Sequence, residues 1–218
     1  MEKDKVIFFD LDGVLIDTEP LYSRFWMEAM KAAGHDMSRE DSLKMRSLDR
    51  ELARDFLRKT YYEDDYDRIR ELRKSLMEAY RKDHPIKTKA GAKEIIERLD
   101  REGIDWYIVT ASPLSRINRY SEDTGLRFPE EKLISTKTVE RGKPYPDVYL
   151  KACETAGVEA AGNIAVEDSP NGVRSAKAAG LTTVFIPDLT QPDEDDMKYC
   201  DHVIAELGGL WDIIFSKD

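Results

Sequence analysis

Two kinds of hydrophobic pattern follow one another along the chain. A continuous apolar run over residues 6–9 leads into Asp10 and a glycine-containing turn, which predicts a short buried strand. Further runs of this kind recur after residue 88, at 106–110, 133–135, 164–166 and 182–186. Segments with apolar residues three and four positions apart separate these runs. We therefore expect a parallel sheet with right-handed crossovers and helices on both faces.

A different pattern fills the interval between the first strand and the second. From residue 18 to residue 85 only helical periodicity is found, as in Tyr22, Phe25, Trp26, Ala29, Met30 and Ala33. Ser38 and Asp41 have the three-residue spacing of a capping box. The pattern predicts a Rossmann-like α/β core made of residues 1–17 and 86–218, with an all-helical domain inserted at 18–85.

Composition and charge restrict the classes of partner that the protein can bind. The 218 residues carry 44 acidic and 34 basic side chains, a formal charge of −10 that would repel nucleic acid. No apolar run approaches the roughly 20 residues needed to span a bilayer, and the N-terminus has no targeting pattern. We expect a cytoplasmic monomer with no membrane partner. The acidic run at 193–196 is interpreted as a solvated loop.

The cysteines and histidines offer little for catalysis or metal binding. Cys153 and Cys200 are far apart and lack the spacing of metal ligands, and the three histidines are scattered along the chain. A zinc site or a histidine-based triad is therefore not expected.

Polar residues stand directly after the predicted strands, where ligands collect in an open parallel sheet. They are Asp10, Asp12, Thr110, Lys143, Glu167 and Asp168. Several carboxylates in one crevice repel one another unless a cation is present. Carboxylate oxygens suit Mg²⁺, which also binds substrate phosphate. The sequence therefore predicts a magnesium site, with Asp10 and Asp168 as the first candidate ligands.

The same residues can perform phosphoryl transfer. Once a cation and Lys143 neutralise a phosphate, the Asp10 carboxylate can attack phosphorus and form an aspartyl phosphate. Asp12 can give a proton to the leaving alkoxide and later take one from water. Each element also has a structural interpretation, because an Asp-x-Asp pair can belong to a turn and residues 167–170 can simply begin a helix.

Four segments of the chain resemble the motifs of one family, the haloacid dehalogenase superfamily, in its β-phosphoglucomutase-like and phosphatase branch. The first motif is similar to residues 9–18, the second to 108–112, the third to 141–147 and the fourth to 166–172. The helical insertion stands where this branch has its cap domain.

This resemblance implies a role for each residue at the strand ends. Asp10 would be the nucleophile and Asp12 the general acid and base. Thr110, the amide of Ala111 and Lys143 would contact the transferred phosphate. The substrate would be a small phosphorylated metabolite, such as a sugar phosphate.

The resemblance also implies a metal site and a moving cap. Mg²⁺ would be held by Asp10, the Asp12 carbonyl and Asp168, with Glu167 assisting directly or through water. The cap would close over the core, with hinges near residues 17–18 and 85–86.

Residues 43–50 are similar to the specificity loop of that branch. Arg46 would then contact substrate. The chain departs from the family pattern at Met45, where a glycine is often found before the arginine, and a solvated helix charge is an equal interpretation of Arg46.

We expect a Mg²⁺-dependent phosphatase that hydrolyses small phosphate monoesters through an aspartyl phosphate, and other functions remain open as alternatives. A phosphatase and a phosphomutase share the first half-reaction and differ in whether water or a sugar hydroxyl receives the phosphoryl group. A mutase would need a second cationic group in the cap, for which Lys44, Arg46 or Arg50 is available. A phosphorylatable receiver has a similar acidic pocket but no use for the insertion. Asp12 disfavours a dehalogenase, and a binding protein without activity is a further alternative.

Overall fold

The computed structural model describes residues 5–46, 48, 50–189 and 191–215. The chain divides into two compact units, one formed by Met1–Asp17 with Lys87–Asp218 and the other by Thr18–Ile86. The sequence-based boundary at 85/86 lies one residue earlier than this division. No helix within the described ranges has the length and apolarity needed to cross a membrane.

The first unit, called the core unit below, is built on a six-stranded sheet in the order β3-β2-β1-β4-β5-β6. All neighbouring strands are parallel. The strands are β1 Ile7–Phe9, β2 Trp106–Thr110, β3 Leu133–Ser135, β4 Ile164–Glu167, β5 Thr182–Phe185 and β6 His202–Val203. The first five lie at the predicted apolar runs, whereas the exposed edge strand β6 was not predicted.

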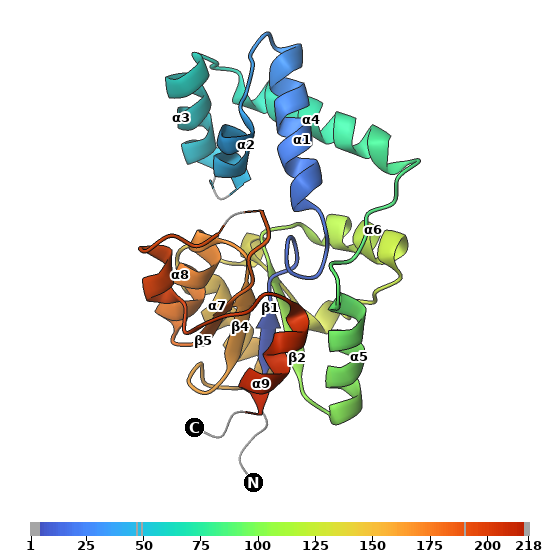
Figure 1. Ribbon diagram of the computed structural model, residues 1–218, viewed down its shortest axis with the longest axis vertical. Coiled ribbons are helices and arrows are strands. Elements are labelled where there is room, and N and C mark those ends of the chain that lie inside the picture. Colours follow the sequence, from blue (N-terminus) through green and yellow to red (C-terminus); the bar gives the residue numbers. More distant parts are fainter. Residues whose placement is uncertain (1–4, 47, 49, 190, 216–218) are drawn as a thin grey trace. The chain divides into compact units, whose positions relative to one another are not determined.

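The connections place helices on both faces of this sheet (Figure 1). From β1 at the centre, β2 and β3 are added in turn toward one edge of the sheet, and β4, β5 and β6 toward the other edge. Right-handed crossovers therefore put α5 and α6 on one face and α7 and α8 on the opposite face. The helices of the core unit are α5 Ala92–Glu102, α6 Leu114–Thr124, α7 Asp147–Ala156, α8 Pro170–Ala179 and α9 Leu210–Ile214. Short 3₁₀ turns occur at Glu130–Lys132, Thr136–Thr138, Asp196–Tyr199 and Leu207–Gly209.

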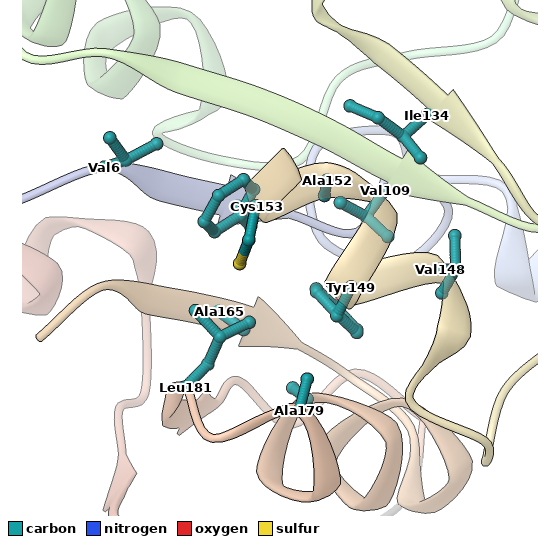
Figure 2. Packing of buried hydrophobic residues seen from close by; sticks show 12 residues of the cluster. Val6, Val109, Ile134, Val148, Tyr149, Ala152, Cys153, Ala165, Ala179 and Leu181 are labelled. Carbon is teal, nitrogen blue, oxygen red and sulfur yellow. The ribbon is translucent and has the colours of Figure 1, made fainter. Parts of the chain in front are cut away.

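Apolar side chains from strands and helices interlock between the sheet and α7 and α8. Figure 2 shows Val109 of β2 and Ala165 of β4 on the sheet side, facing Val148 and Tyr149 of α7. Strand residues whose side chains point to the other face of the sheet, such as Phe9, are also buried. Burial on both faces explains why these strands read as continuous apolar runs rather than as alternating ones.

The register at the centre of the sheet determines where the polar residues lie. Phe9 pairs with Ile108 of β2 on one side and with Val166 of β4 on the other. The direction of winding reverses between β1 and β4, and a crevice for ligands forms at such a switch point beyond the carboxyl ends of the strands. Asp10 therefore follows β1 at the point where Glu167 ends β4.

The second unit consists of helices α1 Glu19–Ala32, α2 Arg39–Arg46, α3 Arg50–Tyr61 and α4 Tyr66–Arg81. Their apolar faces share one hydrophobic cluster that includes Trp26, Met30, Leu57 and Ile69. Met45 also belongs to this cluster and is 4% exposed. Its long apolar side chain packs inside the helical unit, which accounts for a methionine at this position.

The predicted capping box at the start of α2 is half formed. Ser38 Oγ accepts a hydrogen bond from the Asp41 amide at 3.0 Å. The Asp41 carboxylate instead accepts a hydrogen bond from the Tyr61 hydroxyl, at 2.6 Å, and pairs with Lys44. A partner from α3 thus takes the place of the reciprocal bond within the box.

The two connections between the units run beside each other within the core unit. The Asp17 amide donates a hydrogen bond to the Lys87 carbonyl at 2.9 Å, and the Lys89 amide donates to the Leu15 carbonyl at 2.9 Å. Ile16 and Thr88 form an antiparallel bridge between these two bonds. The insertion therefore leaves and re-enters the core at one place.

The acidic run is more ordered than a solvated loop. Asp193 Oδ1 accepts hydrogen bonds from the amides of Asp195 and Asp196. Asp196 is only 6% exposed and pairs with Arg174 of α8 at 3.2 Å. The interpretation of 193–196 as a solvated loop is wrong for Asp196, which is buried and whose charge is compensated by Arg174.

Candidate active site

The segment after β1 makes a tight turn directly after Asp10, the candidate nucleophile. The Asp10 amide donates a hydrogen bond to the Val166 carbonyl of β4 at 2.9 Å, which continues the ladder between the two strands. Gly13 then adopts φ 88°, in the left-handed region that favours glycine, and its amide donates to the Ile16 carbonyl. This tight turn keeps both Asp10 and Asp12 at the end of the strand.

Lys143 links the ends of β1 and β4. Its ammonium donates hydrogen bonds to Asp10 Oδ1 at 2.6 Å and to the Val109 carbonyl at 2.9 Å, and it lies 2.6 Å from Glu167 Oε1. The side chains of Lys143 and Asp10 are 10% and 12% exposed. One buried cation thus joins two carboxylates whose mutual repulsion is little screened by solvent.

Burial and charge alter the pKa values of this pair. Burial raises the pKa of Asp10 well above its ordinary value, and the negative charges of Glu167, Asp168 and Asp12 raise it further, although Lys143 acts in the opposite direction. For Lys143, burial alone would lower the pKa, but the charges of Asp10 and Glu167 outweigh burial and raise it. Lys143 is therefore charged at neutral pH. Its single positive charge does not offset the combined negative charge of the neighbouring carboxylates.

Glu167 is fixed on one side by a tyrosine and on the other by a glycine. The Tyr149 hydroxyl of α7 donates a hydrogen bond to Glu167 Oε1. Glu167 Oε2 is buried and has no hydrogen-bond partner among the described residues. Its carboxylate lies against the backbone of Gly172 in α8, where any Cβ would overlap it. The absence of a side chain at position 172 creates the space that this carboxylate fills.

Three buried carboxylates form a group that can hold a metal ion. Asp10, Glu167 and Asp168 each offer one oxygen, and these oxygens lie within 4.8 Å of one another. An all-oxygen donor set of this kind suits a hard divalent cation. The donor set, the buried Glu167 Oε2 and the raised pKa of Asp10 all fit a cation at this point.

The residues after Asp168 do begin a helix, as the structural interpretation of this segment expected. Ser169 is the N-cap of α8, its hydroxyl accepts a hydrogen bond from the Gly172 amide at 3.2 Å, and Pro170 is the first helical residue. The structural and the chemical interpretations of this segment are compatible, because the cap fixes the direction in which the chain leaves Asp168.

Thr110 and Ala111 stand at the end of β2, beside β1 in the sheet. Thr110 is 1% exposed and its Oγ1 accepts a hydrogen bond from the Ser112 amide at 3.0 Å. Since this bond occupies an acceptor position, the hydroxyl hydrogen of Thr110 is available to a ligand oxygen. Ala111 is exposed directly after the strand.

Asp12 is half-buried and is held by two hydroxyl groups. Ser112 Oγ donates a hydrogen bond to Asp12 Oδ2 at 2.6 Å, and the Tyr120 hydroxyl of α6 donates to Asp12 Oδ1 at 3.1 Å. Both oxygens of this carboxylate are therefore anchored from the segment that follows β2.

The predicted cap residues belong to the helical unit. Arg46 is the last residue of α2, and its side chain lies outside the described part of the chain, as do residues 47 and 49. Lys44 pairs with Glu40 and Asp41, and Arg50 pairs with Asp67.

The sequence of the chain also matches a family model. Residues 5–180 match the model of the haloacid dehalogenase-like hydrolases. The chain belongs to the haloacid dehalogenase-like hydrolase family. The matched range includes every strand-end residue described above, from Asp10 to Asp168.

Relatives of this hydrolase include proteins named as phosphatases. The chain is 31% identical over 186 residues to hexitol phosphatase B of Escherichia coli K12. The aligned region covers 82% of each protein. It is 26% identical over 190 residues to the phosphorylated carbohydrates phosphatase of Thermotoga maritima, covering 83% of this chain and 84% of that protein.

A solved structure has the same fold over nearly the full length of this hydrolase. It is a family IA, variant 3 hydrolase of the superfamily from Entamoeba histolytica, with a TM-score of 0.78 and 26% identity. The match covers 97% of this chain and all of the other.

The sequence did not predict which helix residues hold the carboxylates of this hydrolase's site in place. Tyr149 and Tyr120 lie on α7 and α6, and each donates its hydroxyl to a carboxylate at a strand end. A buried tyrosine usually finds a hydrogen-bond partner, but its position in a helix does not say which partner it finds. Ser112 lies within residues 108–112, which resemble the second family motif, but no role of its own was predicted for it.

Proposed function

We propose that this hydrolase is a Mg²⁺-dependent phosphatase that cleaves small phosphate monoesters, with sugar phosphates as the favoured class, through an aspartyl phosphate on Asp10. The observation that carries the proposal is the position of Lys143, 2.6 Å from both Asp10 Oδ1 and Glu167 Oε1. A buried cation next to a buried carboxylate nucleophile suits a reaction that gathers negative charge on a phosphoryl group.

In the first half-reaction the Asp10 carboxylate attacks phosphorus. The bond between phosphorus and the ester oxygen breaks, and that oxygen takes a proton from Asp12 as it leaves. Lys143 holds Asp10 by Oδ1 and offers positive charge to the phosphoryl oxygens. The Thr110 hydroxyl and the Ala111 amide are proposed to donate hydrogen bonds to the same oxygens.

In the second half-reaction a water molecule attacks the phosphorus of the aspartyl phosphate. Asp12, now a carboxylate, takes a proton from this water, and the bond between phosphorus and Asp10 breaks. Phosphate leaves and both aspartates return to their starting states. The hydroxyl groups that hold Asp12 allow it to serve in both halves from one position.

Asp10, Asp168 and the Asp12 carbonyl are proposed to hold the magnesium ion, with Glu167 as a further ligand or a partner of its water. When bound, the ion supplies positive charge that neutralises the cluster and the substrate phosphate. The raised pKa of Asp10 supports a further cation here, because burial and the neighbouring carboxylates both disfavour the ionised form of Asp10.

Hydrolysis needs no second phosphate site in the helical unit, and this favours it over mutase activity. A mutase would use a cap cation for a second phosphate, and two of the three candidates already have carboxylate partners. Lys44 pairs with Glu40 at 3.0 Å, and Arg50 pairs with Asp67 at 2.7 Å. The relatives named as phosphatases of hexitols and phosphorylated carbohydrates support the same choice and the substrate class.

The direct test is phosphate release from a panel of sugar phosphates and other phosphometabolites, with Mg²⁺ and with a chelator. Wild type is expected to release phosphate only with Mg²⁺, and Asp10→Asn in neither condition. Asp105→Asn is the matched control, because Asp105 is an aspartate at the opposite end of the sheet with a side chain that is 68% exposed. Release that survives in Asp10→Asn, or absence of release by wild type from every compound, would contradict the proposal.

A further inference from the structure

Asp12 is anchored at both carboxylate oxygens by two residues of the segment that follows β2. Ser112 Oγ lies 2.6 Å from Oδ2, and the Tyr120 hydroxyl lies 3.1 Å from Oδ1. A carboxylate at the end of a short side chain rotates easily about its last bond when only one oxygen is held. Two donors, one on each oxygen, oppose that rotation.

The direction of the Ser112 hydroxyl is itself determined. Arg116 Nη1 donates a hydrogen bond to Ser112 Oγ at 3.2 Å. A guanidinium only donates, so the serine oxygen accepts from Arg116 and its own hydrogen points to Asp12. The Ser112 carbonyl also accepts a hydrogen bond from Ser135 Oγ at 3.0 Å, which fixes the backbone at this residue.

The Tyr120 hydroxyl is equally well placed. The side chain is 1% exposed and is among the largest fully buried side chains of the described residues. Its ring is therefore held by packing, and the hydroxyl can move little relative to α6. A buried tyrosine needs some acceptor, but this one uses the carboxylate that must carry protons in the proposed reaction.

We propose that Tyr120, together with Ser112, is a positioning residue for Asp12 that sets the geometry of proton transfer to the leaving group. The inference rests on the proposed phosphatase function and adds to it a residue outside the strand-end motifs. Proton transfer requires the carboxyl group to lie within hydrogen-bond reach of the reacting oxygen, and a misplacement of about 1 Å can slow it greatly. Loss of one anchor allows the carboxyl group to rotate away from the ester oxygen.

The test is Tyr120→Phe, which keeps the ring and removes only the hydroxyl. Its kcat/KM, which reports the steps up to ester cleavage, is measured for an alkyl phosphate and for 4-nitrophenyl phosphate. An alkoxide needs a proton as it leaves, whereas nitrophenolate is a stable anion. Tyr120→Phe is expected to lose about 10-fold or more on the alkyl ester, a part of the roughly 10²–10⁴ that general acid catalysis contributes. On the nitrophenyl ester it should stay within about 2-fold of wild type.

Tyr61→Phe is the matched control. It removes another tyrosine-to-aspartate hydrogen bond, from Tyr61 to Asp41 at 2.6 Å in the helical unit, and should leave the ratio of the two substrates unchanged. Circular dichroism and calorimetric Mg²⁺ binding verify that Tyr120→Phe is folded and retains its metal site.

The possible outcomes separate the inference from the proposed function. An active wild type with a Tyr120→Phe variant that loses equally on both esters, or on neither, would overturn the positioning role alone. A wild type that releases phosphate with Mg²⁺ from neither ester and from no compound of the panel would overturn the phosphatase proposal and the role of Tyr120 with it. A selective loss on the alkyl ester would support both.

Discussion

Lys143 Nζ and Asp10 Oδ1 lie 2.6 Å apart, although 133 positions of sequence separate the two residues. The contact exists because the loop after β3 returns to the centre of the sheet, where β1 ends. With Glu167 on the other side of the ammonium, Lys143 is the shared partner of two carboxylates. Its removal should therefore affect both the binding of phosphate and the arrangement of the acids.

Lys143→Ala is expected to lower kcat/KM by about 10²–10³-fold, the usual loss when one donor to developing charge is removed. The comparison is made on the best substrate of the panel, at saturating Mg²⁺. Lys151→Ala is a suitable control, because Lys151 is an exposed lysine of α7 paired with Glu154. Equal catalytic efficiency in Lys143→Ala and wild type would show that this ammonium does not stabilise the transition state.

Binding of Mg²⁺ should raise the melting temperature of the wild type, since the ion binds the folded carboxylate cluster and has no such site in the unfolded chain. At about 100 times the dissociation constant the gain is about 2.7 kcal/mol, which corresponds to roughly 5–10 °C for a chain of this size. Asp168→Asn should lose most of this shift. Asp105→Asn should keep it, and a shift of equal size in Asp168→Asn would argue against a metal site at this cluster.

Gly172→Ala should displace Glu167, because the new Cβ would overlap the Glu167 carboxylate. We expect a loss of about 1–3 kcal/mol in the free energy of unfolding and weaker Mg²⁺ binding by titration calorimetry. Gly208→Ala is the control, since the nearest atom to a Cβ at Gly208 is Glu206 Oε1 at an ordinary 3.7 Å. Unchanged stability and unchanged Mg²⁺ affinity in Gly172→Ala would mean that Glu167 has another position available.

Asp12→Asn should accumulate the aspartyl phosphate. With 4-nitrophenyl phosphate the first step needs little acid assistance, whereas the second step loses the base that activates water. Intact-protein mass spectrometry after an acid quench should show the mass of one added phosphoryl group. The same experiment with Asp10→Asn should show none. A phosphorylated Asp10→Asn protein would place the nucleophile elsewhere.

The sequence predicted the sheet well because its strands are buried on both faces. The apolar runs at 106–110 and 133–135 coincide with β2 and β3. The rule that ligands collect at strand ends was sufficient to select Asp10, Lys143 and Glu167, which the structure brings together. The edge strand His202–Val203 escaped prediction because both of its residues are exposed, so that no apolar run marks it.

The partners of the carboxylates were beyond sequence reasoning for a physical reason. Tyr149 and Tyr120 reach Glu167 and Asp12 from helices whose periodicity marks only which face is buried. Whether a buried hydroxyl meets a carboxylate depends on the packing angle of the helix against the sheet, which a single sequence does not contain. The role of Asp196 as a partner of Arg174 was missed for the same reason.

The paired connections at Asp17 and Lys87 have a consequence for how such an enzyme can change. Because the hydrogen bond between these residues closes the core unit on itself, the core's six strands and its acidic cluster form a complete module without the inserted helices. We expect that replacement of residues 18–86 by another segment leaves the strand register and the placement of Lys143 unchanged. The inserted segment can therefore vary at this point while the strand-end residues of the core keep their positions.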